Sequence, residues 1–477
     1  MLFPTIDFAI FFVVVLTASW LLMPRRCWWR CLMLVASAVF YGWWDWRFLG
    51  LLGGSAIANH VAATAIGRLR SPAARRGVLV AAITANLGAL AWFKYYGFLV
   101  TSVADTLAGV GVQVHLPLLQ VVLPVGVSFF TFHALSYVID VYRRVLRPAT
   151  LQDFTLYLAF FPHLVAGPII RAKDFLPQLR RPRDPRKVDG SRAFWLITAG
   201  LFKKVVVANL LATRLVDPVF ANPRLYAAPD VLAAIYGYAV QIFADFSGYT
   251  DIAIGCALLL GFQFPQNFDR PYTAVSLQEF WRRWHITLSS WLRDYLYIPL
   301  GGSRGSKAKT TRNLLVTMLV GGLWHGAAWT FVAWGGIHGA ALAVERRVTG
   351  LRGEVGRGSA RRRAGTVWHP LVGWLVTFNV VCLAWVFFRA ESFSAAGTML
   401  SRLATGWGQA QICTPALVAL IAGSIATQFV PKDLGLRLEA AFSRLGPLPQ
   451  AVALAAALFA IDALGPQGVA PFIYFQF

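Results

Sequence analysis

Apolar runs of about 20 residues recur along the whole sequence, and they constrain the fold more than any other feature. A helix needs roughly 20 apolar residues to cross the hydrocarbon core, and only helices or closed barrels satisfy their backbone there. The runs lie near 6–23, 32–45, 48–66, 78–100, 116–140, 153–170, 194–214, 230–262, 313–345, 368–390, 413–430 and 447–464. We therefore expect an all-α, polytopic membrane protein with about a dozen transmembrane, re-entrant and interfacial helices.

The charges fall between these runs, and most of them are positive. The 477 residues have a mean hydropathy of +0.58, with 57% apolar and only 14% charged side chains, yet the net charge is +23. Basic clusters in short loops are typical of the cytoplasmic side of a membrane protein. The pattern therefore predicts contact with membrane lipid and excludes a nucleic-acid-binding face.

The order of the runs predicts one membrane domain over residues 1–477, without a soluble domain. Counting basic clusters as cytoplasmic gives a consistent topology until 153–170, which has basic residues on both flanks. That segment is predicted to be a hairpin or a re-entrant helix. The first run ends in Pro24-Arg25-Arg26 and not in a small-residue cleavage site, so it is interpreted as a retained span.

Several classes of chemistry find no support in the sequence. Its five cysteines are scattered, without CxxC spacing or a neighbouring histidine cluster, so no metal site and no disulfide framework are predicted. No G-x-S-x-G, P-loop, HExxH or dinucleotide fingerprint is present. We therefore expect no bound cofactor, no serine esterase and no ATP-driven pump.

One short stretch, Trp281 to Gly305, mixes tryptophan with four arginines and a histidine. Placed on a single helix, Trp281, Trp284 and Trp291 share one side, Arg282 and Arg293 lie on an adjacent side, and His285 is at the boundary. Such a helix is expected to lie at the membrane interface. An interfacial anchor with an incidental histidine is an equal alternative.

His325 lies in a different setting, the uncharged and glycine-rich segment Met318 to Ala340. An ionisable group at that depth is costly and indicates a function. Desolvation keeps an imidazole neutral, which is the form that a general base requires. His325 is therefore a candidate base for a hydroxyl substrate; the alternative is a hydrogen bond between helices.

Acidic residues are rare, so Asp245 and Asp251 stand out within an apolar run. With Ser247, Gly248 and Tyr249 between them, they suggest a broken helix whose freed backbone lines a cavity. The alternative, that they are buried partners for arginines, is compatible with this interpretation.

Five motifs in a fixed order resemble the membrane-bound O-acyltransferase family, and most closely its branch that acetylates bacterial exopolysaccharides such as alginate. The resemblance extends over about residues 30–390, whereas residues 391–477, expected to be C-terminal helices, carry no motif of the family. The motifs are LPVGVSFFTFHALSYVIDVYR, FPHLVAGPIIRAKDFLPQL, QIFADFSGYTDIAIGCALLLGFQFPQNFDRPY, EFWRRWHITLSSWLRDYLYIPLGGSRG and GGLWHGAAWTFVAWGGIHG.

The resemblance implies an acyl transfer within a helical fold that surrounds a central funnel or tunnel. The family's catalytic histidine, in its LWHG-type motif, corresponds to His325, and a second functional histidine corresponds to His285, where other branches have asparagine. A supporting role is therefore expected for His285. Further candidates for substrate binding are Trp324, Asp245, Tyr249, Asp251, Arg282, Arg293 and Arg304.

The resemblance also implies the reaction partners. Acetyl-CoA is the expected donor, attracted by basic cytoplasmic loops; the expected location is the bacterial inner membrane. A periplasmic SGNH-type acetyltransferase and the polysaccharide synthesis and export machinery, for alginate, cellulose or another polymer, are the expected partners. Two alternatives stay open: D-alanyl transfer to teichoic acid from a carrier protein, and a non-enzymatic polysaccharide or solute transporter.

Overall fold

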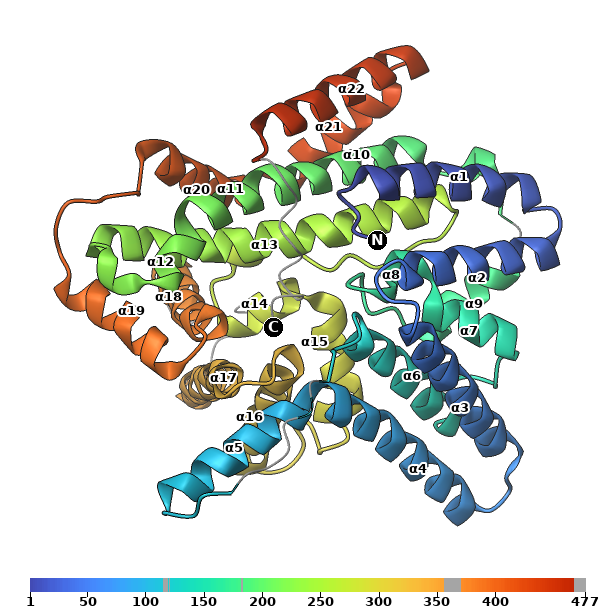
Figure 1. Cartoon of the computed structure of the whole chain (residues 1–477), viewed down its shortest axis with the longest axis horizontal. Coiled ribbons are helices and arrows are strands. Elements are labelled where there is room, and N and C mark those ends of the chain that lie inside the picture. Colours follow the sequence, from blue (N-terminus) through green and yellow to red (C-terminus); the bar gives the residue numbers. More distant parts are fainter. Residues whose placement is uncertain (115–118, 120, 182, 356–369, 467–477) are drawn as a thin grey trace. The chain divides into compact units, whose positions relative to one another are not determined.

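Helices account for every regular element in the residues described by the computed structural model, namely 1–114, 119, 121–181, 183–355 and 370–466 (Figure 1). This confirms the predicted all-α class. Six helical segments are long and apolar enough to cross a membrane: Phe48–Arg68, Pro72–Gly109, Gly190–Ala221, Ala228–Leu259, Pro370–Arg389 and Pro447–Leu464.

The chain divides into two compact units, of which unit 1 comprises residues 1–193 and 253–265. Here α3 packs against α4, α6 and α7, and α1 packs against α2. Asn59 on α3 and Asn86 on α4 exchange side-chain hydrogen bonds of 3.2 and 2.8 Å, the kind of polar contact that joins membrane helices. Its helices are α1 (Ile6–Leu22), α2 (Arg26–Gly42), α3 (Phe48–Arg68), α4 (Pro72–Leu90), α5 (Tyr96–Gly109), α6 (Val127–Tyr142), α7 (Leu151–Ala159), α8 (Phe161–Leu164) and α9 (Ala172–Arg180).

The segment predicted to be re-entrant or a hairpin, 153–170, contains only the short helices α7 and α8. At 1.5 Å per residue, neither is long enough to cross a bilayer. The chain leaves the first helix at Phe160, and Pro162 lies inside the second. Basic residues on both flanks place both ends of the segment on one side of the membrane, and two short helices satisfy that without a span.

Unit 2 comprises residues 194–252 and 266–477, so α10 and α13 are shared between the two residue sets. Two π-helical segments, η3 (Phe202–Ala208) and η4 (Ala212–Val216), interrupt the helix that begins at Gly190. The elements are α10 (Gly190–Leu201), α11 (Asn209–Leu211), α12 (Asp217–Ala221), α13 (Ala228–Leu259), α14 (Leu277–Arg283), α15 (Ile286–Leu292), α16 (Lys307–His325), α17 (Trp329–Val355), α18 (Pro370–Arg389), α19 (Phe393–Thr405), α20 (Pro415–Thr427), α21 (Lys432–Arg444) and α22 (Pro447–Leu464).

Close packing of α16 against α17 forms a helical hairpin that ends at the candidate base. A methyl group added at Gly322 would lie 2.3 Å from the carbonyl oxygen of Phe331, and one at Gly335 would lie 2.3 Å from that of Met318. Only glycine permits so short a separation of the two backbones. The glycines of this apolar segment therefore hold its two helices together.

The C-terminal helices α19 to α22 belong to unit 2 and are tied to it by polar contacts. The Asp230 carboxylate accepts hydrogen bonds from the backbone N–H groups of Gln411, Ile412 and Cys413, at 2.8 to 3.0 Å. These three N–H groups precede α20, where no helical carbonyl can bind them. The region without a recognised motif is thus anchored at the start of α13.

Candidate active site

The stretch predicted to be one Trp/Arg helix is broken at His285, and that prediction is wrong. Trp284 is extended (φ −99°, ψ 127°), and His285 adopts the left-handed conformation (φ 42°, ψ 55°) before α15 begins. This conformation is uncommon for a histidine and persists only where the surroundings enforce it. The helical-wheel argument consequently does not apply across the break.

The enforcing partner is Asn267, whose side-chain oxygen lies at the start of α15. It accepts hydrogen bonds from the backbone N–H of Thr287 at 3.2 Å and from its hydroxyl at 2.9 Å. The backbone carbonyl of Asn267 accepts the N–H of Ile286 at 2.9 Å. Asn267 thus serves the first turn of α15 in the way that an N-cap residue does, although it comes from a distant loop.

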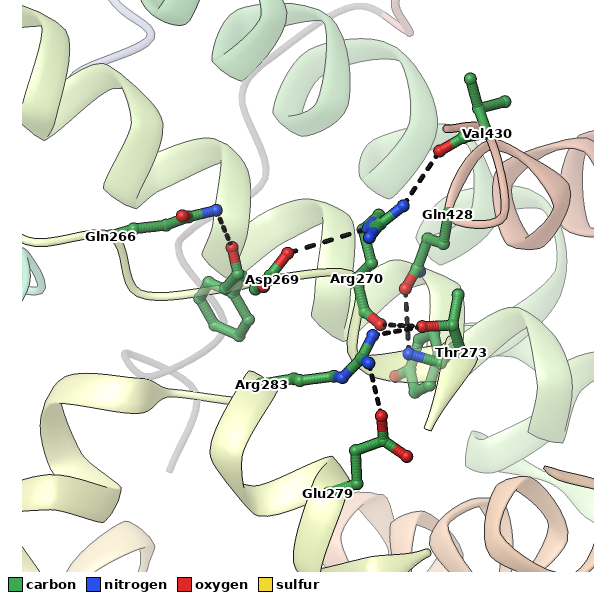
Figure 2. Close-up of polar contacts among 10 residues, drawn as sticks. Gln266, Asp269, Arg270, Thr273, Glu279, Arg283, Gln428 and Val430 are labelled. Carbon is green, nitrogen blue, oxygen red and sulfur yellow. Dashed lines mark hydrogen bonds and ion pairs between the residues drawn. The ribbon is translucent and has the colours of Figure 1, made fainter. Parts of the chain in front are cut away.

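The loop that carries Asn267 is itself fixed by polar contacts (Figure 2). Arg270, with φ 49°, donates to the carbonyl of Val430 at 3.0 Å, and Thr273 accepts from Arg283 of α14 at 2.6 Å. Arg283 also forms an ion pair with Glu279. The loop and α14 therefore hold each other, and both hold the position of His285.

His285 is completely buried, and its protonation pattern follows from its one polar partner. Its Nδ1 lies 3.1 Å from the oxygen of Asn267, which can only accept, so Nδ1 carries the proton and donates. Its Nε2 is buried without a hydrogen-bond partner in the described residues and keeps its lone pair. Burial lowers the pKa of His285 to about 3, because the charged form is desolvated. The ring is therefore neutral near pH 7.

His325 is the last residue of α16 and is 4% exposed. Its ring lies among aromatic rings, with centroid separations of 5.0 Å to Trp324, 5.0 Å to Trp334 and 5.3 Å to Phe388, all in edge-to-face arrangements. Gly326 leaves the helix in an extended conformation. The hairpin with α17 thus places an imidazole at a helix end inside an aromatic enclosure.

The structure brings His285 and His325 to one tryptophan. The Trp324 ring centroid lies 6.1 Å from that of His285 and 5.0 Å from that of His325. Phe246 of α13 covers His285 at 4.6 Å, nearly perpendicular to it. Two buried imidazoles beside one indole can bind a hydroxyl group and accept its proton in surroundings from which water is largely excluded.

The two aspartates of α13 do not break the helix, and the predicted broken helix is wrong. Helix α13 runs without interruption from Ala228 to Leu259. Lys204 pairs with Asp245 at 2.5 Å with both side chains almost fully buried, and Lys203 pairs with Asp251. The partners are lysines of the π-helical segment η3, and not arginines. Because the lysines neutralise the carboxylates, the backbone has no need to open.

The other predicted binding residues lie in different surroundings. Tyr249 is buried within α13. Arg282 is exposed on α14, Arg304 is exposed in the turn before α16, and exposed Arg293 pairs with its neighbour Asp294 at 2.7 Å. The tunnel implied by the resemblance stays a prediction, because the two cavities described below are lined by residues of unit 1.

Sequence reasoning missed the partners of two predicted residues: Asn267, which binds His285, and Lys204, which pairs with Asp245. Asn267 lies in the third of the five family motifs, and an amide next to an apolar run is a signal of a buried hydrogen-bonding role. Lys204 lies in the apolar run 194–214, where a buried cation requires a partner. Both signals indicate that a partner exists, but neither identifies it.

The sequence is similar to those of several known proteins. Residues 84–388 match the model of the membrane-bound O-acyltransferase family. The probable alginate O-acetylase of Pseudomonas aeruginosa is 42% identical over 84% of this chain and 74% of its own length. The peptidoglycan O-acetyltransferase of Helicobacter pylori is 35% identical over 76% of this chain and 71% of its own. The teichoic acid D-alanyltransferase of Streptococcus thermophilus is 31% identical over 55% of this chain and 67% of its own.

Proposed function

The chain belongs to the membrane-bound O-acyltransferase family, and on that premise we propose that it transfers acetyl groups to a bacterial exopolysaccharide. The observation that carries the proposal is the pair of buried histidines beside Trp324, within the segment that matches the family. Relatives named for O-acetylation of alginate and of peptidoglycan support an acetyl group and a polysaccharide acceptor.

In the proposed reaction the donor is a cytoplasmic thioester, with acetyl-CoA as the simplest candidate. His325 removes the proton from an acceptor hydroxyl while the oxygen attacks the acetyl carbonyl carbon. The carbon–sulfur bond then breaks, and the protonated imidazole returns its proton to the departing thiolate, so that ester and free thiol are the products. No covalent enzyme intermediate is required.

His285 has a supporting role in this proposal. Because the Asn267 side-chain oxygen accepts the Nδ1–H of His285, the Nε2 of the ring, which has no hydrogen-bond partner in the described residues, is available to accept a hydrogen bond from the same hydroxyl. The exposed cations Arg282, Arg293 and Arg304 are candidates to attract the phosphates of the donor.

The immediate acceptor is proposed to lie on the periplasmic face of the inner membrane. It is either a sugar hydroxyl of the polymer or a serine of an SGNH-type acetyltransferase that works with the polysaccharide synthesis and export machinery. Purified chain in vesicles, supplied with radiolabelled acetyl-CoA and each acceptor in turn, is expected to label one of them. Absence of label on both acceptors, while the vesicles retain intact protein, would contradict the proposal.

A second candidate function is D-alanyl transfer, which the teichoic acid D-alanyltransferase relative favours. Radiolabelled D-alanyl carrier protein used as the donor in the same vesicles tests it directly. Label from this donor and none from acetyl-CoA would replace the first proposal. A non-enzymatic transporter would move unmodified sugar across the vesicle membrane without any transfer of label.

A further inference from the structure

Unit 1 contains a cavity of about 390 Å³ with four arginines in its wall, which we call the arginine cavity. It lies where α1 ends and α2 begins, against the loop that follows α9. Arg26, Arg30, Arg181 and Arg183 line it together with apolar side chains, and the lining contains no aspartate or glutamate. A neighbouring cavity of about 540 Å³ shares Arg181 and Arg183 but has a mixed lining of acids and bases.

Arg183 is the most deeply placed of the four. Its guanidinium carbon lies 3.7 Å from the ring centroid of Trp29 and 4.4 Å from that of Phe262. Aromatic faces attract such a planar cation and hold it in one orientation. The Nε and Nη1 atoms are buried and have no hydrogen-bond partner within the described chain.

The positive charges around Arg183 make a bound anion favourable. In the residues that the structure covers, only Arg30 has a carboxylate partner, Asp153 at 3.0 Å, and that residue is outside the cavity lining. Burial and the nearby charges of Arg26 and Arg30 lower the pKa of Arg183 to about 9. A guanidinium is thus kept partly desolvated, beside like charges and without a carboxylate partner among the described residues, which is costly unless an anion is bound.

The walls of the arginine cavity are held in place by their own hydrogen bonds. The indole N–H of Trp29 donates to Ser19 at 2.8 Å, and that of Trp20 donates to the carbonyl of Leu259 at 3.0 Å. Gly261 has φ +80°, and a methyl group on it would lie 2.9 Å from Arg183. The two indole hydrogen bonds therefore fix one wall of the arginine cavity, and Gly261, which lines the neighbouring cavity, leaves room beside the Arg183 side chain.

We propose that the arginine cavity binds the phosphate of an anionic phospholipid. The guanidinium groups match a phosphate in charge and in hydrogen-bonding geometry, and basic pockets between membrane helices commonly take such headgroups. Trp20 and Met23 supply an apolar wall, and the neighbouring side chains of Leu21 and Trp28 are exposed, as expected at a lipid boundary. A soluble phosphate ester would contact the arginines in the same way, but it has no acyl chains to pack against these apolar side chains.

The test uses the full chain in detergent and three probes that differ by one feature: dioctanoyl-phosphatidylglycerol, dioctanoylglycerol without phosphate, and glycerol 3-phosphate without acyl chains. Native mass spectrometry at low salt measures each dissociation constant. In the unmodified protein, we expect dioctanoylglycerol and glycerol 3-phosphate to bind at least tenfold more weakly than dioctanoyl-phosphatidylglycerol. Arg183→Gln and Arg26→Gln should each weaken the binding of dioctanoyl-phosphatidylglycerol at least fivefold.

Matched controls are available in the sequence next to these residues. Arg25 and Arg186 are exposed and line neither cavity, so Arg25→Gln and Arg186→Gln should change the affinity less than twofold. Arg26 is exposed, so its variant reports on binding even where Arg183→Gln reduces expression. Equal binding by the Arg26→Gln variant and the unmodified protein would overturn the proposal. Glycerol 3-phosphate binding as tight as that of the lipid would instead assign the cavity to a soluble phosphate ester.

Discussion

The histidine site of unit 2 and the arginine cavity of unit 1 differ in how their buried ionisable groups are stabilised. In unit 2, neutral His285 donates its Nδ1–H in a hydrogen bond to an amide oxygen, and the buried cation Lys204 is paired with Asp245. In unit 1, Arg183 keeps its charge against aromatic faces, without a carboxylate among the described residues.

The difference follows from what each group can do with its proton. Histidine can release its proton near neutral pH and so becomes a neutral base when it is buried. Arginine keeps its charge at physiological pH, so burying it is costly unless an anion lies close to the guanidinium group. A buried histidine can therefore serve as a base, whereas an arginine without a carboxylate partner among the described residues favours a bound anion.

The largest expected effect is at His325. Replacing it with alanine should lower the rate of acetyl transfer by about 10² to 10⁴-fold, the range that a general base contributes. Insertion and folding should be preserved, as measured by the amount of protein extracted from membranes and its elution volume. An alanine variant with normal activity would exclude His325 as the base.

Removing the paired cation of unit 2 should affect stability. Lys204→Met leaves the Asp245 carboxylate buried without its lysine, which costs about 3 to 5 kcal/mol of unfolding free energy. Thermal denaturation in detergent measures the loss. The double variant Lys204→Met with Asp245→Asn should recover most of it, because no charge is then left buried.

Arg183→Gln provides the contrast in unit 1. Since Arg183 has no carboxylate partner within the described residues, its removal in the absence of phospholipid should leave the melting temperature unchanged or raise it. A fall in melting temperature as large as that of Lys204→Met would mean that Arg183 and Lys204 contribute alike to stability, and would contradict the difference drawn between the two units.

Asn267 should act on the reaction through His285. Asn267→Ala removes the acceptor of the Nδ1 proton and leaves a buried donor unsatisfied, a cost of about 1 to 3 kcal/mol. We expect a fall in kcat of about 10- to 100-fold. Thr287→Val removes only the hydroxyl bond to the same oxygen and should cost less than threefold. Equal losses in the two variants would point to a structural effect on α15 alone.

The smallest effect should be a pH dependence of stability. The ordinary pKa of histidine is 6.5, and that of His285 in the fold is about 3. Below pH 6.5 the unfolded chain therefore binds a proton that the folded chain does not, and stability falls as the pH decreases, by about 1 to 2 kcal/mol at pH 5. His285→Asn should show a shallower decrease between pH 7 and pH 5. Identical pH profiles would mean that His285 is not buried as a neutral group.

Much of the architecture could be predicted from the sequence, because helix formation in a membrane depends on local composition. The apolar runs indicated the helices, and the charge pattern identified 153–170 as an unusual segment. The candidate site was predicted less completely. His285 and His325 could be selected individually, but their shared contact with Trp324 depends on the break before α15 and on the α16–α17 hairpin.

Two sequence-based predictions were wrong because they considered only residues that are close together in the sequence. The stretch at Trp281 had helical periodicity throughout, yet hydrogen bonds that the distant Asn267 accepts stabilise a break within it. The stretch at Asp245 looked unable to stay helical, yet lysines from another helix neutralise its carboxylates. In both cases the deciding partner was remote in sequence.

By itself, the sequence determined that this chain is helical, lies in a membrane and carries few ionisable groups at depth, since these properties depend on residues close together along the chain. Tertiary structure alone decided the partners of those groups: an amide oxygen accepts the Nδ1–H of His285, Asp245 pairs with Lys204, and two aromatic faces hold Arg183. The reason is physical, because desolvation raises the cost of a buried charge and leaves only the partners within a few ångströms to determine its state.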